Sequence, residues 1–251
     1  MAEGRKQLGL IGRPLSHSFS KSFFTDKFRS LGLTNYHYEL YELETIEEFL
    51  PLVKHTPDLI GINVTIPYKM EVMGFLDEIS AEAKAIGAVN VIKIDGNKLY
   101  GFNTDYYGFK TSLLNWLPNN WHGKALILGT GGASLAVIAA LTNSEIPFHV
   151  VSRNSGTDLL TYDQVKALDL LATHRLVLNT TPLGMQPQVN TAPDLDYHKI
   201  GSKHYLFDLV YNPASTTFMR NGAAMGAKVK NGLEMLELQA EKAWDIWTSN
   251  Q

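Results

Sequence analysis

The chain has 251 residues, of which 45% are hydrophobic and 19% charged, and its formal net charge at pH 7 is -3. This length suits one large domain or two small ones, and the composition is that of an ordinary soluble protein. The slight negative charge and the lack of Lys/Arg runs argue against a nucleic acid or an anionic membrane as partner. Because the chain has no cysteine, disulfides and thiolate chemistry are excluded. No signal peptide or membrane-length apolar run is evident, so we expect a cytoplasmic protein.

The first hundred residues alternate between strand and helix patterns. In chain order we first expect a strand at 8–11, a helix that buries Phe24, Phe28 and Leu31, and a strand at 36–40. Next come a helix that is opened by a Thr45–Glu48 capping box and buries Phe49, Leu50 and Val53, and a strand at 60–66. The last elements are a helix at 81–86, begun by Ser80 and stopped by Gly87, and a hairpin of strands 88–94 and 99–103 with its turn at Gly96.

The second part of the chain repeats this alternation. A helix is expected at 106–116, then a strand at 124–128, a helix at 133–141, strands at 148–151, 175–178 and 205–210, and a last helix at 233–247. The pattern predicts an α/β fold without internal repeats.

The strand at 60–66 ends in polar residues of three kinds. Asn63 and Thr65 alternate with apolar residues, Pro67 stops the strand, and Lys69 follows. The amide, hydroxyl and ammonium groups could meet at one edge of a sheet and hold a small oxygen-rich molecule. An ordinary strand with polar outward residues and a solvated lysine explains the same pattern.

Serines surround a histidine just after the first strand. Ser16, His17, Ser18 and Ser20 lie in a loop or first helical turn, where hydroxyls and free backbone donors can meet a ligand. Instead of binding a ligand, one of the serines could cap the helix. His17 could be a loop residue that hydrogen-bonds the backbone.

A glycine-rich loop joins the strand at 124–128 to the next helix. It reads Gly129-Thr130-Gly131-Gly132-Ala133-Ser134, and Ser134 stands at the third glycine of the dinucleotide fingerprint. The strand, glycine loop, helix and strand follow in the order that this fingerprint requires. The context therefore favours nucleotide binding over a purely structural turn.

The end of the next strand indicates which dinucleotide is bound. Ser152-Arg153-Asn154 replaces the acidic residue that binds the ribose 2′-hydroxyl of NAD, and an arginine suits the 2′-phosphate of NADP. Asp158 is a more distant competitor, and a solvated surface charge is the alternative for Arg153. The scattered histidines have no metal-ligand spacing, so no metal site is predicted.

The ordered motifs together resemble the shikimate dehydrogenase family, from about Leu8 to Trp247. They are His17-Ser18-Phe19-Ser20, Asn63-Val64-Thr65-Ile66-Pro67-Tyr68-Lys69, Gly87-Ala88-Val89-Asn90, Asn103-Thr104-Asp105, Gly129-Thr130-Gly131-Gly132-Ala133, Asn179-Thr180-Thr181-Pro182-Leu183-Gly184-Met185, Tyr211-Asn212-Pro213 and the segment from Gly232 to Gln239. The resemblance implies reduction of 3-dehydroshikimate to shikimate with NADPH, in the route to chorismate and aromatic amino acids.

The resemblance also implies two α/β domains with a cleft between them. Residues 1–104 would bind the substrate, residues 105–231 would form a Rossmann-type NADP-binding domain, and the C-terminal helix in 232–251 would return to the first domain. The only partners expected are the small-molecule substrate and the cofactor, in a monomer or homodimer.

Roles follow from the same resemblance, residue by residue. Lys69 and Asp105 would be the catalytic pair, and Ser18 and Ser20 would bind the substrate carboxylate. The other substrate-binding residues would be Asn63, Thr65, Asn90, Tyr211 and Gln239. The cofactor would contact Gly129, Thr130, Gly131, Gly132, Ala133, Ser152, Arg153, Asn154, Asn179, Thr180, Thr181, Met185 and Gly232.

The chain departs from the family pattern in two places and leaves two other functions open. Lys21 replaces a usual proline, and Thr157 occupies a second basic position near Arg153, which could weaken the preference for NADP. A quinate/shikimate dehydrogenase using NAD is the alternative enzyme. A non-catalytic nucleotide sensor on the same fold is disfavoured because both Lys69 and Asp105 are present.

Overall fold

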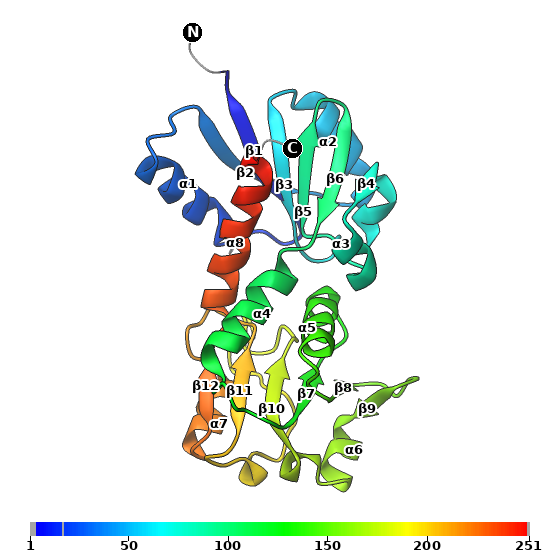
Figure 1. The fold of residues 1–251 in the computed structure, drawn as a ribbon, viewed down its shortest axis with the longest axis vertical. Coiled ribbons are helices and arrows are strands. Elements are labelled where there is room, and N and C mark those ends of the chain that lie inside the picture. Colours follow the sequence, from blue (N-terminus) through cyan, green and yellow to red (C-terminus); the bar gives the residue numbers. More distant parts are fainter. Residues whose placement is uncertain (1–3, 17, 250–251) are drawn as a thin grey trace. The chain divides into compact units, whose positions relative to one another are not determined.

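The computed structural model describes residues 4–16 and 18–249. The chain divides into two compact units, Met1–Thr104 with Ala240–Gln251, and Asp105–Gln239 (Figure 1). Among the described residues, no helix combines the length and the apolar character needed to cross a lipid bilayer.

The first unit is built on a mixed six-stranded sheet with the order β2-β1-β3-β5-β6-β4. Its elements are β1 (Lys6–Gly12), α1 (Ser20–Ser30), β2 (Tyr36–Glu42), η1 (Ile46–Glu48), α2 (Phe49–His55), β3 (Leu59–Val64), η2 (Glu71–Phe75), β4 (Glu78–Ile79), α3 (Ala81–Ile86), β5 (Val91–Asp95), β6 (Lys98–Phe102) and the last part of α8 (Leu233–Thr248). Only β5 runs against its neighbours, so β1, β3 and β6 all end at the same edge of the sheet.

Helices cover both faces of this sheet. Phe24 of α1 and Trp247 of α8 belong to the core on one face, whereas Phe49 of α2 belongs to the core on the other. The Trp247 indole donates a 2.9 Å hydrogen bond to the carbonyl of Ile92 and lies directly over Gly61, where a Cβ would overlap it. Burial of each large ring contributes roughly 2 to 3 kcal/mol, so these contacts fix the end of α8 on the first unit.

Several local expectations for the first unit are wrong. The 60–66 strand ends at Val64, and Asn63 is buried because the sheet is covered on both faces, so the alternative of an outward, solvated residue does not hold for Asn63. Thr45 makes no side-chain cap: its side chain hydrogen-bonds Glu47, and Glu48 accepts from the backbone of Glu44. Three apolar residues expected at buried or alternating positions are exposed, namely Leu31, Leu50 and Ile66.

Other boundaries differ by a few residues. The 88–94 strand begins only at Val91, because Val89 donates to the carbonyl of Lys69 and not to a neighbouring strand. The Ser80 cap and the Gly96 hairpin are confirmed: Ser80 accepts from the amide of Ala83, and Gly96 has a φ of 59° between paired β5 and β6.

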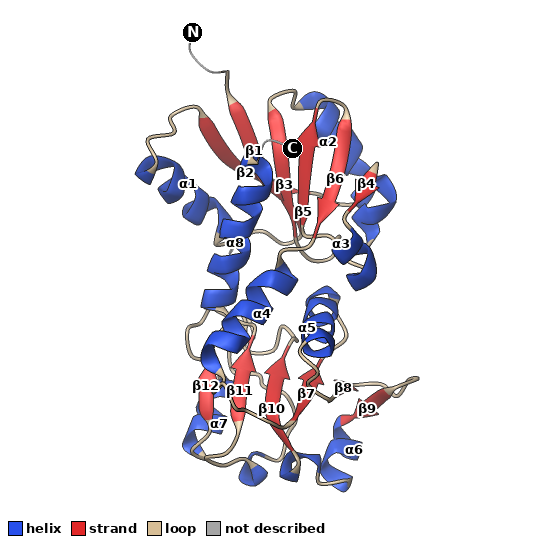
Figure 2. Ribbon diagram, viewed as in Figure 1, coloured by secondary structure: helices blue, strands red, loops and turns tan. Residues whose placement is uncertain are grey.

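The second unit contains an all-parallel sheet with the order β12-β11-β10-β7-β8-β9 (Figure 2). Its elements are α4 (Asp105–Trp116), β7 (Lys124–Leu128), α5 (Gly132–Asn143), β8 (Phe148–Ser152), β9 (Leu159–Thr161), α6 (Tyr162–Ala167), η3 (Leu170–Ala172), β10 (His174–Asn179), η4 (Tyr197–Lys199), β11 (Tyr205–Asp208), α7 (Thr217–Ala224), β12 (Lys228–Lys230) and the first part of α8.

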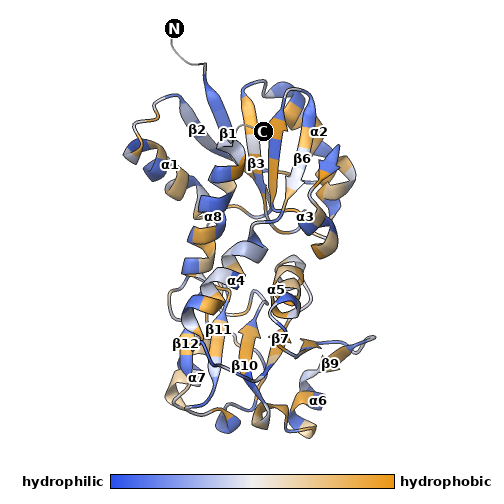
Figure 3. Ribbon diagram, in the orientation of Figure 1, coloured by the Kyte–Doolittle hydropathy of each residue, from blue (hydrophilic) through white to orange (hydrophobic). Residues whose placement is uncertain are grey.

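The central strands of this sheet are continuous apolar runs, as expected for parallel strands covered on both faces (Figure 3). Phe109 of α4 packs on Phe207 of β11, with ring centroids 5.4 Å apart, whereas Phe218 of α7 and Val165 of α6 belong to the core that also holds Leu206. The predicted fold class, two α/β parts with a Rossmann-type second sheet and a C-terminal helix that returns to the first, is confirmed.

Candidate active site

In the first unit, the predicted substrate residues gather at one edge of the sheet. Ser18 and Ser20 follow the end of β1, Asn63 and Thr65 lie at the end of β3, and Asn90 precedes β5. Because β1 and β3 are parallel and β5 runs the opposite way, these positions share the same edge. We call this set, together with Lys69, the polar edge.

Asn63 is held by a tyrosine that the sequence analysis did not select. The Tyr38 hydroxyl donates a 2.7 Å hydrogen bond to Oδ1 of Asn63, and both residues are buried. The Ser20 side chain also hydrogen-bonds Tyr38. Burial raises the pKa of Tyr38 well above its usual value, and the Ser20 bond only partly opposes this. One hydroxyl therefore joins two predicted substrate residues.

Asn90 joins the ends of three strands. Its backbone carbonyl accepts from the amide of Val64 at 2.8 Å, while its side chain accepts from the amide of Thr104 at 2.6 Å and donates to the Thr104 hydroxyl at 3.0 Å. Asp105 follows Thr104 directly in the chain. The backbone that leads into Asp105 is thus fixed by a residue of the polar edge.

The turn between Thr65 and Lys69 is fixed through its backbone. The amide of Thr65 donates to Ile11 of β1 at 2.9 Å, and the carbonyl of Lys69 accepts from Val89 at 2.8 Å. The segment that carries Lys69 therefore lies beside the segment that carries Asn90. Lys69 belongs to the first unit and Asp105 to the second.

In the second unit, the glycine loop lies at the carboxyl end of β7. Gly129 has a φ of 114°, which side chains rarely adopt, and a Cβ there would lie 2.8 Å from the hydroxyl of Thr180. A Cβ at Gly131 would meet no atom within 4 Å, so open space lies in front of the N-terminus of α5. The Ser134 hydroxyl turns inward to the Gly131 carbonyl at 2.6 Å. Backbone N–H groups at the N-terminus of a helix, beside open space, suit the pyrophosphate of a dinucleotide.

A positively charged side chain, that of Arg153, lies at the end of β8. Arg153 is exposed directly after Ser152, the last residue of β8, and it forms no ion pair within the part of the chain that the structure describes. The Ser152 hydroxyl accepts from the amide of Asn154 at 3.3 Å and so shapes the turn. An unpaired guanidinium at this strand end fits a 2′-phosphate.

The predicted cofactor loop after β10 uses its side chains to hold itself together. Asn179 donates to the buried carboxylate of Asp208 at 2.9 Å and accepts from the hydroxyl of Thr181 at 2.6 Å. Thr180 donates its hydroxyl to Leu128 at 2.8 Å. The backbone is also bonded, since the amide of Thr180 donates to Leu128 at 3.0 Å and that of Thr181 to Oδ1 of Asn179 at 3.1 Å. These contacts fix the shape of the loop. Met185, farther along, is exposed.

Asp208 is a buried acid that was missed. Besides Asn179, it accepts from the amide of Val210 at 3.0 Å and from the Thr216 hydroxyl at 2.5 Å. Burial raises the pKa of Asp208 to about 6, although these hydrogen bonds oppose the shift. Its signal in the sequence is an acidic residue inside an otherwise apolar strand.

The remaining predicted residues lie near the end of the second unit. Gly232 packs against the backbone of Leu209, where any Cβ would overlap the carbonyl, and Gln239 of α8 lies against Gly108 of α4. Tyr211 follows β11 by three residues. His17 lies outside the described residues, within which no group of three or more potential metal ligands occurs.

Comparison with known proteins gives a consistent result across the chain. The model of the shikimate dehydrogenase substrate binding domain matches residues 10–92. The shikimate dehydrogenase (NADP(+)) of Clostridium beijerinckii is 41% identical, and the alignment covers 97% of this chain and 92% of that protein.

Solved structures agree with the sequence relatives. Shikimate dehydrogenase 1 of Peptoclostridium difficile is 37% identical, with a TM-score of 0.83 over 98% of this chain and 92% of that one. The shikimate 5-dehydrogenase of Thermus thermophilus, solved in complex with NADP(H) and shikimate, is 32% identical, with a TM-score of 0.83 over 97% and 93% of the two chains.

Proposed function

Because the chain belongs to the shikimate dehydrogenase family, we propose that it reversibly reduces 3-dehydroshikimate to shikimate with NADPH, a step toward chorismate and the aromatic amino acids. The chain is an NADP-dependent oxidoreductase. The observation that carries the proposed reaction is the polar edge, where hydroxyls and amides from three strand ends meet in one unit. A polyhydroxylated carboxylate needs such a set of donors and acceptors.

Substrate binding is assigned to this edge. Ser18 and Ser20 bind the carboxylate, and Asn63, Thr65 and Asn90 bind ring hydroxyls. Support comes from the backbone anchoring of Thr65 and from the hydrogen bonds that hold Asn63 and Asn90 in place. From the second unit, Gln239 binds a ring hydroxyl and Tyr211 lies near the carboxylate. In this assignment residues 1–104 form the substrate-binding domain and residues 105–231 form the cofactor-binding domain. Residues 232–251 contain the C-terminal helix, which returns to the first domain.

The cofactor is assigned to the carboxyl edge of the parallel sheet. The glycine loop Gly129–Ala133 receives the pyrophosphate, and Arg153 with Ser152 and Asn154 receives the 2′-phosphate. The open space at Gly131 and the unpaired Arg153 support this assignment. The backbone of Asn179, Thr180 and Thr181 contributes the opposite wall, with Met185 and Gly232 beyond it.

Proton transfer is assigned to Lys69 and Asp105 as a joint acid/base pair. When bound, NADPH supplies the hydride that reduces the ketone carbon. The ammonium of Lys69 stabilises the developing alkoxide and donates the proton, and Asp105 is the second member of the pair. The anchoring of Thr104 by Asn90 supports this arrangement, because it fixes the backbone on which Asp105 stands.

One feature favours a second candidate, a quinate/shikimate dehydrogenase that uses NAD. Thr157 stands where a second base could hold the 2′-phosphate, so Arg153 alone discriminates the cofactors. Comparing kcat/KM for shikimate and quinate with NADP and NAD separates the candidates. A preference for quinate with NAD would favour the second one.

A spectrophotometric assay of the purified chain tests the proposed function directly. Consumption of NADPH on addition of 3-dehydroshikimate, and its formation from shikimate and NADP, are the expected results. Cofactor binding without either reaction would refute the proposal and favour a nucleotide sensor. A cytoplasmic location and a monomeric or homodimeric state are also proposed, and the latter is checked by analytical ultracentrifugation.

A further inference from the structure

We propose that Tyr38 is a positioning residue for the substrate, which acts by fixing the side-chain amide of Asn63 in the orientation that donates to a substrate oxygen. The inference rests on the proposed function of the polar edge. It concerns a residue that makes no part of that edge itself and lies on β2, one strand beyond β1.

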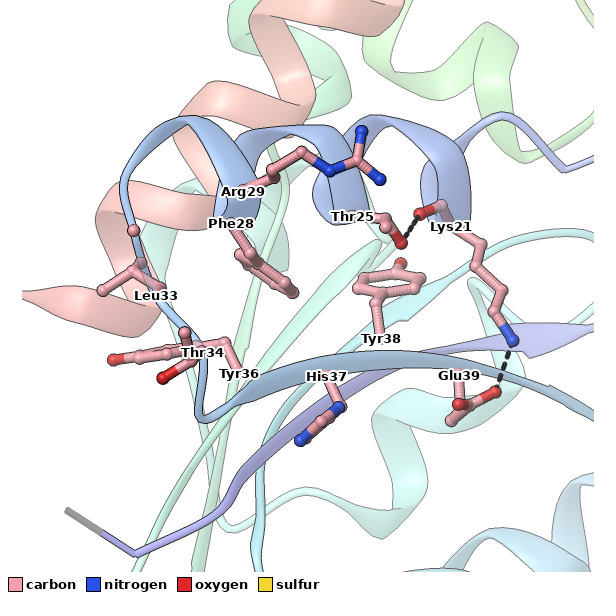
Figure 4. A pocket seen from close by; sticks show the side chains of 11 residues that line it. Lys21, Thr25, Phe28, Arg29, Leu33, Thr34, Tyr36, His37, Tyr38 and Glu39 are labelled. Atoms are coloured by element: carbon pink, nitrogen blue, oxygen red, sulfur yellow. Dashed lines mark hydrogen bonds and ion pairs between the residues drawn. The ribbon is translucent and has the colours of Figure 1, made fainter. Parts of the chain in front are cut away.

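The position of the Tyr38 hydroxyl is fixed by packing. Its ring stacks on Phe24 of α1, with centroids 4.7 Å apart and an interplanar angle of 11°, and only 3% of the residue is exposed. Figure 4 shows the side chain pointing from β2 toward α1. A ring held in this way cannot swing away from its partner, so the 2.7 Å bond to Asn63 is built into the core.

The direction of the hydrogen bonds gives Tyr38 its effect. A tyrosine hydroxyl has one hydrogen to donate, and here that hydrogen goes to Oδ1 of Asn63 while Ser20 hydrogen-bonds the same hydroxyl. Burial raises the pKa of Tyr38, so the hydroxyl keeps the hydrogen that it donates at neutral pH.

With Oδ1 committed to Tyr38, the amino group of Asn63 becomes the donor end of the amide. It makes one long bond of 3.4 Å to the carbonyl of Asn90, and an amide nitrogen carries two hydrogens. One hydrogen is therefore left for a ligand oxygen. Without the Tyr38 hydroxyl, only the long bond to Asn90 distinguishes the two ends of the amide. An Asn63 side chain flipped by 180° would turn its oxygen, which is an acceptor, toward the oxygen of the ligand.

The same region supplies a matched control. Tyr38 also lines a pocket of about 380 Å³ between α1 and β2, which contains none of the predicted site residues (Figure 4). Tyr36 lines the same pocket from the same strand, and its hydroxyl accepts from the ammonium of Lys6 at 3.1 Å, away from the polar edge. Tyr36→Phe thus removes a hydroxyl without touching Asn63.

The test compares wild type, Tyr38→Phe, Tyr36→Phe, Asn63→Ala and the double variant Tyr38→Phe/Asn63→Ala, with KM and kcat measured for shikimate and NADP. Tyr38→Phe keeps the stacked ring, so we expect a KM for shikimate raised about tenfold, with KM for NADP unchanged and kcat reduced no more than about threefold. Tyr36→Phe should match wild type. When Asn63 is already alanine, adding Tyr38→Phe should raise KM for shikimate by less than about a further twofold, because the amide that Tyr38 orients is no longer present.

Several outcomes would overturn the inference. The first is a KM for shikimate in Tyr38→Phe that equals the wild-type value. The second is an equal rise of this KM in Tyr36→Phe. The third is a tenfold rise caused by Tyr38→Phe even when Asn63 is replaced by alanine. If Tyr38→Phe does not fold, NMR of the wild type decides: the side-chain amide signals of Asn63 must shift on addition of shikimate, and unmoved signals refute the proposal. A wild type with no shikimate turnover would instead refute the proposed function, which distinguishes the two failures.

Discussion

The side-chain amide of Asn179 donates a 2.9 Å hydrogen bond to the carboxylate of Asp208, and neither residue is exposed to solvent. The bond joins the ends of β10 and β11, which are also paired through the amide of Leu209 and the carbonyl of Asn179 at 3.0 Å. The second carboxylate oxygen accepts from Thr216, which caps α7. One buried acid thus joins the proposed cofactor loop after β10 to the end of β11 and to the N-terminus of α7.

The first prediction concerns the pH dependence of stability caused by Asp208. Burial raises the pKa of Asp208 to about 6, whereas an unfolded aspartate titrates near about 3.9. Between these values the folded state holds a proton that the unfolded chain has released, so this contribution to stability is present below pH 4 and is lost as pH rises to 6. The loss amounts to roughly 3 kcal/mol.

Urea unfolding of wild type and Asp208→Asn between pH 4 and pH 7 measures this contribution. In the variant the amide oxygen can still accept from Asn179 and Val210, but the side chain cannot ionise. The stability of wild type relative to the variant should therefore fall as pH rises. Parallel stability curves over the whole range would contradict the assignment.

His174 should contribute a pH dependence of the opposite sign. Burial lowers the pKa of this side chain, helped by nearby His149 and opposed by its hydrogen bond to Leu170. Below about pH 6.5 the unfolded chain binds the proton more readily than the folded one, so stability falls as pH decreases through this value. His174→Asn, which can still donate to Leu170, should flatten the slope between pH 7.5 and pH 5.5. An unchanged slope in urea unfolding would show that another group is responsible.

The two glycines of the loop after β7 should respond differently to the same substitution. Gly129→Ala forces a side chain into a φ of 114° and against Thr180, so it should lower the free energy of unfolding by about 1 to 3 kcal/mol. Gly131→Ala meets no neighbouring atom and should leave stability within about 0.5 kcal/mol, yet it occupies space proposed for phosphate and should raise KM for NADP about tenfold or more. Unchanged NADP binding by Gly131→Ala would place the pyrophosphate elsewhere.

Cofactor choice is tested at Arg153. Arg153→Gln removes the cation from the end of β8 and should lower kcat/KM for NADP about 10- to 100-fold, with the value for NAD changed by less than about threefold. Arg175→Gln, which removes another exposed arginine, serves as control. Equal losses with both cofactors would show that Arg153 does not read the 2′-phosphate.

Features determined by neighbouring residues were predictable from the sequence. The Ser80 cap, the Gly96 turn and the strand from Lys124 to Leu128 depend on local hydrogen bonding or on continuous apolar character, and the structure places them as expected. The glycine loop between β7 and α5 was also recognisable, because strand, loop and helix follow one another directly.

Two kinds of feature were not predictable, namely the outcome of competing local hydrogen bonds and features that depend on tertiary contacts. The Thr45–Glu48 spacing matches a capping box, but the only capping box among the described helices forms at Thr161 and Gln164. For Asn63, periodicity left both a ligand-facing and a surface position open, because it cannot show that α1 and α8 cover this face of the sheet. Tyr38 and Asp208 were missed because the partners that link them to the proposed site, Asn63 and Asn179, are 25 and 29 residues away in the chain.

The most direct test of the account is the kinetic effect of removing the Lys69 ammonium. Lys69→Ala should reduce kcat at least about 100-fold, as expected for loss of a proton donor, with KM for shikimate within about threefold of wild type. Lys84→Ala, on the exposed side of α3, should match wild type. A kcat near the wild-type value in Lys69→Ala would contradict the proposed mechanism.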